Sequence, residues 1–413
     1  MLIVRELPWS RNGLAYALSP IEEKVRVFVA RSRDELLTAI EKDERPVVLY
    51  SLSTPNFVEY WQEIAAAASK APVVVGGPHA IGDPATLLRL GVKYVVIGDG
   101  EAALPAIVRR ELEGSDEMPP NTLLLSDGRI RSGPREFVDI NRYRTYSTVL
   151  DAYPPIEIMR GCVYRCSFCL TWRLSPVRYR GIESVADMVR AYVERGIKDI
   201  RFVAPVGFLY GSRDGRTPDV SSLVELLEAV RRAGGRPYLG TFPSETRPET
   251  ITDEVLRALK GLLANRRISF GLQTASERLL KLSKREHDVD VVFNAAETAR
   301  RHGFTPIVDV IAGLPGEGED DVRATVAAME KLVKLGSKIR LHYFIPLPGT
   351  PLWGLRPAPL HDNYRKFAAK YAPYVEGYWE EQMELANKIL ETYREVEAFL
   401  SRRSGPLPAG PTA

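Results

Sequence analysis

Short apolar runs alternate with amphipathic stretches along the first 112 residues of the chain. Four apolar runs, rich in valine and flanked by turn residues, have the length and composition of buried strands: 26–30, 46–50, 72–75 and 94–97. Three stretches repeat apolar residues at helical spacing: 57–70, 84–90 and 101–112. Strands separated by helices favour a parallel sheet, so this part is predicted to be a doubly wound, Rossmann-like α/β domain.

A second and more regular α/β pattern begins at Ile156. Six strand-like runs start near Ile156, Ile200, Pro237, Ile268, Pro306 and Ile339. Five helical stretches accompany them: 183–195, 221–233, 252–264, 289–302 and 319–335. Three of these helices end at a glycine, as helix C-termini commonly do: Gly196, Gly303 and Gly336. The pattern predicts a partial (β/α)6 barrel with its active site at the carboxyl ends of the strands, although it is also compatible with eight strands.

The change from one pattern to the other sets the expected domain boundaries. Residues 1–115 form the first domain, and 116–150 form a linker with a hairpin across the turn dipeptide Asp127-Gly128. Residues 151–355 form the barrel. A charged helical extension follows over 356–403, and the Pro- and Gly-rich residues 404–413 are expected to be a disordered tail.

Composition and charge narrow the class of protein. The 413 residues include 56 basic and 53 acidic side chains, a formal net charge of +3 that gives no support to a nucleic-acid-coating or membrane-surface role. No apolar stretch approaches the roughly 18–20 residues of a membrane-spanning helix. The first 19 residues are interrupted by charges and a proline, unlike a secretory signal. The protein is therefore expected to be cytoplasmic, without a membrane span.

All three cysteines of the chain lie within eight residues, in the run Met-Arg-Gly-Cys162-Val-Tyr-Arg-Cys166-Ser-Phe-Cys169. An odd and clustered set cannot form a disulfide framework, and points to metal or redox chemistry. The run follows the first barrel strand, so the thiols are expected on a loop over the barrel mouth. Three thiolates can hold three irons of a cubane and leave the fourth iron open. The alternative is a structural zinc site, which would need a fourth ligand that is not nearby in the sequence.

This spacing, C-x3-C-x2-C, resembles the signature of the radical S-adenosylmethionine (SAM) superfamily. The resemblance implies a [4Fe–4S] cluster on Cys162, Cys166 and Cys169, whose open iron binds the amino and carboxylate groups of SAM. An electron from the cluster then cleaves SAM to a 5′-deoxyadenosyl radical, which implies a low-potential electron donor such as ferredoxin or flavodoxin. Phe168 matches the family's aromatic that packs on adenine, although ordinary packing would also explain it.

The later strands carry further motifs of one radical SAM subgroup, which includes oxygen-independent coproporphyrinogen oxidase and many methylthiotransferases. The matching residues are Glu245 after strand three, Gln273 on strand four, Arg285 beyond it, and Asp309 on strand five, in Asp-Val-Ile-Ala-Gly-Leu-Pro-Gly. The resemblance implies that Glu245 and Arg285 face the methionine end of SAM, and that Gln273 and Asp309 lie at the ribose. The simpler alternative for each charged residue is a solvated surface charge.

One departure from the family pattern concerns the end of strand two. The usual glycine-glycine-glutamate motif, which meets the SAM amino group, is missing. The sequence there is Phe202-Val-Ala-Pro-Val206-Gly, so backbone carbonyls would have to accept those hydrogen bonds.

The N-terminal domain resembles the cobalamin-binding domain that precedes the barrel in a large radical SAM subgroup. The resemblance rests on three segments that follow predicted parallel strands, at the edge where such sheets bind ligands. These segments are Ser51-Leu-Ser-Thr54, Val75-Gly-Gly-Pro-His79 and Val96-Ile-Gly-Asp-Gly-Glu101. The resemblance assigns the following residues to cobalamin: Ser53, Thr54, Gly76, Gly77, Pro78, His79, Gly98, Asp99 and Gly100. Doubly wound domains that bind nothing also carry such glycines, and a polar loop histidine is the simpler interpretation of His79.

The sequence favours a cobalamin-dependent radical SAM enzyme, most simply a methylase of an unactivated carbon (class B type). A second hypothesis keeps the radical chemistry without methyl transfer, for a cyclisation, ring rearrangement or oxidation. A third is a non-catalytic Fe–S or cobalamin sensor, against which the SAM-binding set argues. The substrate itself is not readable from any loop.

Overall fold

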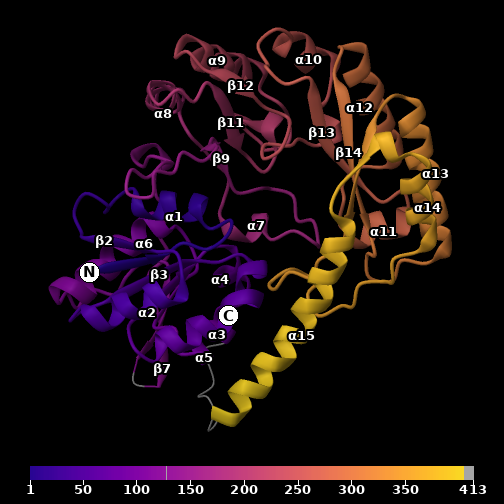
Figure 1. Ribbon diagram of the computed structural model, residues 1–413. Coiled ribbons are helices and arrows are strands. Elements are labelled where there is room, and N and C mark those ends of the chain that lie inside the picture. The colour runs from indigo at the N-terminus through magenta and orange to yellow at the C-terminus, as the bar shows by residue number, and fades with distance from the viewer. Residues whose placement is uncertain (127, 404–413) are drawn as a thin grey trace. The chain divides into compact units, whose positions relative to one another are not determined.

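The computed structural model describes residues 1–126 and 128–403, which divide into two compact units (Figure 1). Unit 1 comprises Met1–Pro154, Arg173–Ser175 and the chain from Lys388 onward, and unit 2 comprises Pro155–Trp172 and Pro176–Asn387. The predicted fold class is confirmed, since unit 1 is built on a mainly parallel sheet and unit 2 on a partial barrel. The predicted tail, 404–413, lies outside the described residues.

A seven-stranded sheet forms the centre of unit 1, in the order β2-β1-β3-β4-β5-β6-β7. Its strands are β1 (Leu2–Arg5), β2 (Val27–Ala30), β3 (Val47–Ser51), β4 (Val73–Gly76), β5 (Tyr94–Val96), β6 (Thr122–Ser126) and β7 (Arg129–Ser132). The first five strands are parallel, while β6 pairs antiparallel with both β5 and β7. The expectation of a separate linker over 116–150 is therefore corrected, because the hairpin in this segment extends the N-terminal sheet.

Alternation of apolar residues along the strands builds one core on each face of this sheet. The helices of unit 1 are α1 (Arg11–Leu18), α2 (Arg33–Lys42), α3 (Thr54–Ala68), α4 (Pro78–Gly82), α5 (Pro84–Arg89), α6 (Gly100–Val108) with the π-helical turn η1 (Arg109–Glu113), and the 3-10 turn η2 (Ile140–Arg142). Val48 and Tyr50 of β3 pack with α2, α3 and α5, whereas Val47 and Leu49 pack with α1 and α6. Helices on both faces make the sheet doubly wound.

Unit 2 is an open barrel whose strands run in two hydrogen-bonded groups, β12-β11-β8 and β13-β14-β15-β16. Its strands are β8 (Ile156–Glu157), β11 (Asp199–Val203), β12 (Arg236–Tyr238), β13 (Arg267–Gln273), β14 (Thr305–Ala312), β15 (Lys338–Tyr343) and β16 (Val375–Glu376), with a small antiparallel pair of β9 (Met159–Arg160) and β10 (Arg178–Tyr179). A single parallel bridge between Thr246 and Phe270 joins the two groups. The six predicted strands are confirmed, and β16 adds a short seventh.

Amphipathic helices cover the outside of the barrel (Figure 1). The helices and turns from residue 171 onward are α7 (Thr171–Leu174), α8 (Ile182–Glu194), η3 (Gly207–Leu209), α9 (Val220–Arg232), η4 (Pro248–Thr250), α10 (Asp253–Leu259), α11 (Glu277–Leu282), α12 (Val289–Arg301), α13 (Glu319–Lys334), α14 (Asp362–Lys370), η5 (Ala372–Tyr374) and α15 (Trp379–Arg403). Gly196, Gly303 and Gly336 follow α8, α12 and α13 in the left-handed conformation that closes a helix C-terminus. The five predicted helices are all present.

The long helix α15 belongs to both units. Its first residues, up to Asn387, belong to unit 2, while Val396 and Leu400 join one core of unit 1. Among the described helices, none combines the length and apolar character needed to cross a membrane.

Candidate functional site

The three cysteines lie on the loop that follows β9. Gly161, with a φ of 83°, turns the chain out of the strand. Cys166 is buried, and Cys162 and Cys169 are half-buried. All three line one cavity of about 220 Å³, together with Phe168 and residues from the ends of four further strands. Burial and the neighbouring thiols raise the pKa of Cys162 to about 11, so a bound metal would be needed to hold it as a thiolate at neutral pH.

Among the described residues, no group of three or more His, Cys, Asp or Glu side chains that could hold a metal ion is found. A structural zinc site would need such a group. In a cubane, by contrast, each of three thiolates binds a different iron.

Two arginines donate hydrogen bonds to the sulfur of Cys166. Arg285 Nη1 lies 3.5 Å from Cys166 Sγ, and Arg247 Nη1 lies 3.9 Å from it. Arg247 also stacks on the ring of Tyr164, with its guanidinium carbon 3.6 Å from the ring centroid. Positive charge and N–H donors beside a thiolate stabilise the negative charge that a reduced cluster would carry.

The other two nitrogens of Arg285 also donate hydrogen bonds within the protein. Nη2 donates to the carbonyl of Gly271 at 3.2 Å, and Nε donates to His287 Nε2 at 3.1 Å. Burial and the positive charge of Arg285 lower the pKa of His287 to about 4, which keeps its Nε2 available as an acceptor.

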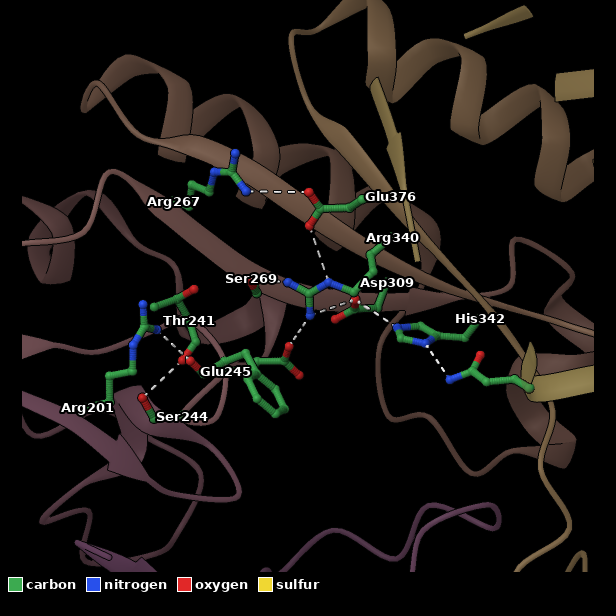
Figure 2. A network of polar contacts seen from close by, with 12 residues as sticks. Arg201, Thr241, Ser244, Glu245, Arg267, Ser269, Asp309, Arg340, His342 and Glu376 are labelled. Atoms are coloured by element: carbon green, nitrogen blue, oxygen red, sulfur yellow. Dashed lines mark hydrogen bonds and ion pairs between the residues drawn. The ribbon is translucent and has the colours of Figure 1, made fainter. Parts of the chain in front are cut away.

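A polar network lies on the neighbouring strands (Figure 2). Arg340 of β15 forms ion pairs with Glu245 and with Asp309 of β14, at 3.3 Å for the latter, and it also contacts Glu376 at 3.4 Å. Burial and the nearby Asp309 carboxylate raise the pKa of Glu245, while Arg340 opposes that shift. The guanidinium therefore allows two carboxylates to stand side by side at the cavity wall.

The first turn of α15 completes this network. Gln382 Oε1 accepts the backbone N–H of Tyr343 at 2.9 Å, which leaves its amide nitrogen to donate to His342 Nδ1 at 3.2 Å. His342 Nε2 then carries the proton and donates to Asp309 at 3.3 Å (Figure 2). Gln382 thus selects the histidine tautomer that holds the carboxylate of Asp309.

Gln273 occupies a strained position at the end of β13. Its φ is 68°, a left-handed conformation that costs energy for a residue with a Cβ, and the strand register shifts between Gly271 and Gln273. The side-chain amide folds back over Gly271, where a Cβ would lie only 1.9 Å from Gln273 Nε2. Backbone strain of this kind concentrates at functional sites.

A second cavity of about 270 Å³ adjoins the first. The two share Phe168, Glu245, Gln273 and Asp309 as lining residues. The second cavity adds apolar and aromatic side chains from β14, β15 and the segment after β15: Ile311, Tyr343, Phe344, Ile345 and Leu347. His342 and Gln382 line the second cavity too, so both cavities combine polar groups with apolar and aromatic surface.

The sequence-predicted SAM residues are brought together by this geometry. Phe168, Glu245, Gln273, Arg285 and Asp309 all line the cysteine cavity, so none of them is merely a solvated charge. Pro205 and Val206, at the divergent end of the second barrel strand, line it too. Four residues of the site were not predicted from the sequence: Arg247, Arg340, His342 and Gln382. Arg247 stands two residues after Glu245 in a recognised segment, which was the one available signal.

The residues predicted to contact cobalamin lie after β3, β4 and β5 of unit 1. Gly77 has a φ of 94°, and a Cβ there would lie 2.6 Å from the carbonyl oxygen of Leu52. A Cβ on Gly98 would lie 2.8 Å from Asn121 Cγ. Packing inside unit 1 therefore already requires these two glycines. The others are distributed as follows: Ser53 caps α3, Gly76 ends β4, Pro78 begins α4, Asp99 accepts the Val138 N–H, and Gly100 begins α6.

His79 lies in α4 and not in a polar loop, as the simpler interpretation expected. Its ring is buried, stacks on Phe57 with centroids 4.2 Å apart, and shares a hydrogen bond of 3.3 Å with the Thr54 hydroxyl. Burial lowers the pKa of His79 to about 4. His79 is therefore a buried helix residue, and its Nε2 has no hydrogen-bond partner among the described residues. Its assignment as a cobalt ligand stays a prediction.

Two family models match parts of the chain. Residues 156–329 match the model of the radical SAM superfamily, and residues 2–108 match that of the B12-binding domain. The first match covers all three cysteines and the strands that carry the cavity residues up to Asp309. The second covers the parallel part of the unit 1 sheet.

Three curated relatives illustrate the range of similar proteins. An uncharacterised protein of Methanopyrus kandleri is 25% identical over 340 residues, which are 70% of this chain and 63% of that protein. An uncharacterised methyltransferase of Pyrococcus horikoshii is 25% identical over 395 residues, 86% of this chain and 81% of that protein. A tRNA-2-methylthio-N(6)-dimethylallyladenosine synthase of Chloroflexus aurantiacus is 30% identical over 208 residues, 48% and 43% of the two chains. The chain spans less than two thirds of the first and third proteins.

Two solved structures share the fold. The radical SAM methyltransferase TsrM from Kitasatospora setae, with cobalamin and a [4Fe–4S] cluster bound, superposes with a TM-score of 0.67 at 20% identity, covering 85% of this chain and 76% of TsrM. The cobalamin-dependent radical SAM enzyme OxsB, with aqua-cobalamin bound, gives a TM-score of 0.64 at 14% identity. The superposition covers 80% of this chain and 51% of OxsB. At these identities the likeness concerns the fold.

Proposed function

Because the chain belongs to the radical SAM superfamily and carries a B12-binding domain, we propose that it is a cobalamin-dependent methylase of an unactivated carbon (class B type). The family's cofactors are a [4Fe–4S] cluster and SAM, and the N-terminal domain adds cobalamin. One observation carries the proposal: a three-thiolate cavity and a B12-binding domain occur in one chain. Methyl transfer draws further support from the similarity to the Pyrococcus protein and to TsrM, both methyltransferases.

The lining of the joined cavities suits the parts of SAM. The cysteines would hold the cluster, with Glu245 and Arg285 toward the methionine end. Gln273 and Asp309 would take the ribose, since an amide and a carboxylate can bind its two hydroxyls. The second cavity, whose lining includes Phe168 and Phe344, would receive the flat adenine ring. The ion pairs of Arg340 would hold the carboxyl groups of Glu245 and Asp309 in place at the cavity wall.

The residues of this chain then have defined tasks. When bound, the cluster supplies the electron that cleaves the SAM sulfonium, and cobalamin supplies a methyl carrier. Arg247 and Arg285 hold positive charge at Cys166, and Phe168 and Phe344 exclude water from the adenosyl end. A radical SAM enzyme also needs a reductant, and we expect a cytoplasmic donor of the ferredoxin or flavodoxin type.

Cobalamin would lie at the carboxyl-end edge of the unit 1 sheet. Ser53, Gly76, Gly77 and Gly98 are half-buried there, so their backbone is accessible to a large flat ligand.

An anaerobic assay tests this function. The protein is reconstituted with iron and sulfide, then mixed with SAM, a strong reductant and hydroxocobalamin, and 5′-deoxyadenosine and methylcobalamin are measured together. Both products are expected, with the first lost in Cys166→Ala. 5′-Deoxyadenosine alone would favour a radical enzyme without methyl transfer. Binding of both cofactors with neither product, in the presence of candidate substrates, would favour a sensor.

A further inference from the structure

Two segments of unit 2 pack against the cysteine loop and form one surface with it. Ser167 of the loop donates its backbone N–H to the carbonyl of Ser283 at 3.0 Å, and its hydroxyl to the carbonyl of Leu282 at 2.9 Å. Val163 of the loop packs against Gly215, where a Cβ would lie 2.7 Å from Val163 Cγ1. Together the three segments form the outer loop face, which comprises residues 163–167, 211–217 and 281–286.

The outer loop face lies next to the cluster cysteines without lining their cavity. Cys166 and Phe168 line the cavity, whereas Arg165 is exposed and does not line it. Lys284 is exposed too, and it precedes Arg285, whose Nη1 lies 3.5 Å from Cys166 Sγ. A partner bound to this face would therefore come close to a cluster on Cys166 and leave the cavity open.

Positive charge is in excess on the outer loop face. Its exposed charged side chains are five basic and two acidic: Arg165, Arg213, Arg216, Lys281, Lys284, Asp214 and Glu286. Both acids are engaged, since Asp214 accepts the N–H groups of Arg216 and Thr217 at 2.7 Å each, and Glu286 pairs with Arg216. The other four basic side chains form no ion pair with any described residue. This one face thus carries an excess of positive charge equal to the formal net charge of the whole chain, +3.

The end of α11 presents a strained lysine beside an apolar side chain. Lys284 has a φ of 51°, a left-handed conformation that costs an L-residue about 1–2 kcal/mol. Its N–H donates to the carbonyl of Lys281 at 3.1 Å and closes the helix. Leu282, between the two lysines in the sequence, is 39% exposed. Strain concentrates at functional sites, and an apolar side chain flanked by charges suits a small, transient protein interface.

Nucleic acid is the other kind of polyanion that a basic face could bind. Proteins that bind single strands stack the bases on exposed aromatic rings. Among the described residues of the outer loop face, Leu282 is the one exposed large apolar side chain, and no aromatic ring is exposed. The face therefore favours an acidic protein.

We infer that the outer loop face docks an acidic protein that delivers the electron to the cluster, an inference that rests on the radical chemistry of the proposed function. The reduced donor loses one electron and the cluster gains it, and no bond forms or breaks in this step. Arg165, Lys281 and Lys284 meet carboxylates of the donor, and Leu282 meets its apolar surface. Complementary charge of this kind speeds the encounter of two proteins more than it tightens the final complex.

Flavodoxin, a small acidic one-electron donor, is the probe that tests this face. Its binding to the full chain is measured by surface plasmon resonance at about 0.01 M and about 1 M salt, where the Debye length is about 30 Å and about 3 Å. The wild type is expected to bind about 10-fold more weakly at the higher salt. At low salt, the double variant Arg213→Glu, Lys281→Glu is expected to bind about 10-fold more weakly than the wild type.

The matched control makes the same charge change elsewhere on unit 2. Lys198→Glu and Lys260→Glu alter exposed lysines that precede β11 and β13, outside the outer loop face, and flavodoxin binding should be unchanged. A second variant guards against misfolding of the first. Lys284→Asn removes one charge from the face, and asparagine tolerates the left-handed conformation, so binding should weaken by about 2- to 5-fold.

Electron delivery is measured as 5′-deoxyadenosine formation with reduced flavodoxin and with reduced methyl viologen, a small cationic donor. At limiting donor, the double variant should lose about 10-fold of the flavodoxin-driven rate and none of the viologen-driven rate, with the iron content of the wild type. A loss of both rates would overturn the inference, because it would mean damage to the cluster site and not to a docking face.

Wild-type flavodoxin binding in the double variant and in Lys284→Asn would also overturn the inference, as would an equal loss in the control. If the double variant instead loses binding of a single-stranded oligonucleotide while flavodoxin binding is unchanged, the face belongs to nucleic acid. The proposed function is judged separately, since formation of 5′-deoxyadenosine and methylcobalamin with methyl viologen does not depend on docking. Intact flavodoxin binding without those products would contradict the proposed function alone.

Discussion

Gln273 offers a test that separates backbone strain from ligand contact. Two variants, Gln273→Ala and Gln273→Gly, remove the same side-chain amide from the cavity. They differ only in whether the residue at a φ of 68° carries a Cβ. A left-handed conformation costs an L-residue about 1–2 kcal/mol, and glycine adopts it freely.

The expected magnitudes follow from that difference. Glycine loses about 0.5–1 kcal/mol more conformational entropy on folding than alanine does, so the net advantage of Gln273→Gly over Gln273→Ala is about 1 kcal/mol. In a unit of this size, that corresponds to a melting temperature higher by about 2–4 °C. Both variants should bind SAM about 5- to 30-fold more weakly than the wild type, the effect of about 1–2 kcal/mol for one lost amide contact.

Differential scanning calorimetry of the apo protein and titration with SAM measure the two effects. Equal melting temperatures for the alanine and glycine variants would show that residue 273 is not held in the left-handed region. Wild-type SAM affinity in both variants would remove Gln273 from the SAM site. Weaker binding in one variant alone would mean that the backbone, and not the amide, makes the contact.

Three further substitutions have defined outcomes. Cys166→Ala should lose iron and all 5′-deoxyadenosine formation; retained SAM cleavage would refute the cluster assignment. Gly271→Ala should leave the melting temperature nearly unchanged yet weaken SAM binding, because its Cβ displaces the flexible amide end of Gln273; unchanged affinity would refute this reasoning. Burial raises the pKa of Glu317 to about 7. The contribution of the neutral carboxyl to the free energy of unfolding is therefore fully present below about pH 4.5. It is lost as the pH rises through 7, a decrease of about 3 kcal/mol. Glu317→Gln, which can still accept from the Gly313 N–H and bond Tyr364, should flatten the wild-type decline in chemical-denaturation stability, and parallel pH profiles would contradict it.

The repeating elements were predictable because their periodicity is strong. Each barrel helix predicted from residue 183 onward has an apolar stripe and a clear start or end in the sequence. The glycines after α8, α12 and α13 mark three of these ends. The elements that were missed are short or weakly patterned. β1 has only four residues, and α1 contains Gly13, whose missing Cβ admits the Ser51 side chain. The hairpin was recognised, but its pairing with β5 depends on a tertiary contact.

The site was predictable where the chemistry is local to a motif. The three thiols and Phe168 occupy one loop, and the strand ends bring Gln273 and Asp309 to the same cavity. Arg340 could not be predicted, because nothing in the pattern of β15 says that its guanidinium will meet two carboxylates from other segments. Gln382 was even harder to predict from the sequence, because it lies on a helix that begins 36 residues after the end of β15.

The glycines of unit 1 show why a motif can match for two reasons at once. Gly77 and Gly98 are required by contacts with Leu52 and Asn121, which would exist in a doubly wound domain without any ligand. His79, the one residue whose chemistry could have identified a cobalt site, is enclosed by Phe57 and Thr54 instead. The assignment of cobalamin therefore rests on the match of residues 2–108 to the B12-binding domain, and not on any single side chain. A cobalamin titration of the His79→Gln variant separates these two cases: wild-type affinity is expected, whereas a large loss with the fold intact would return His79 to the ligand site.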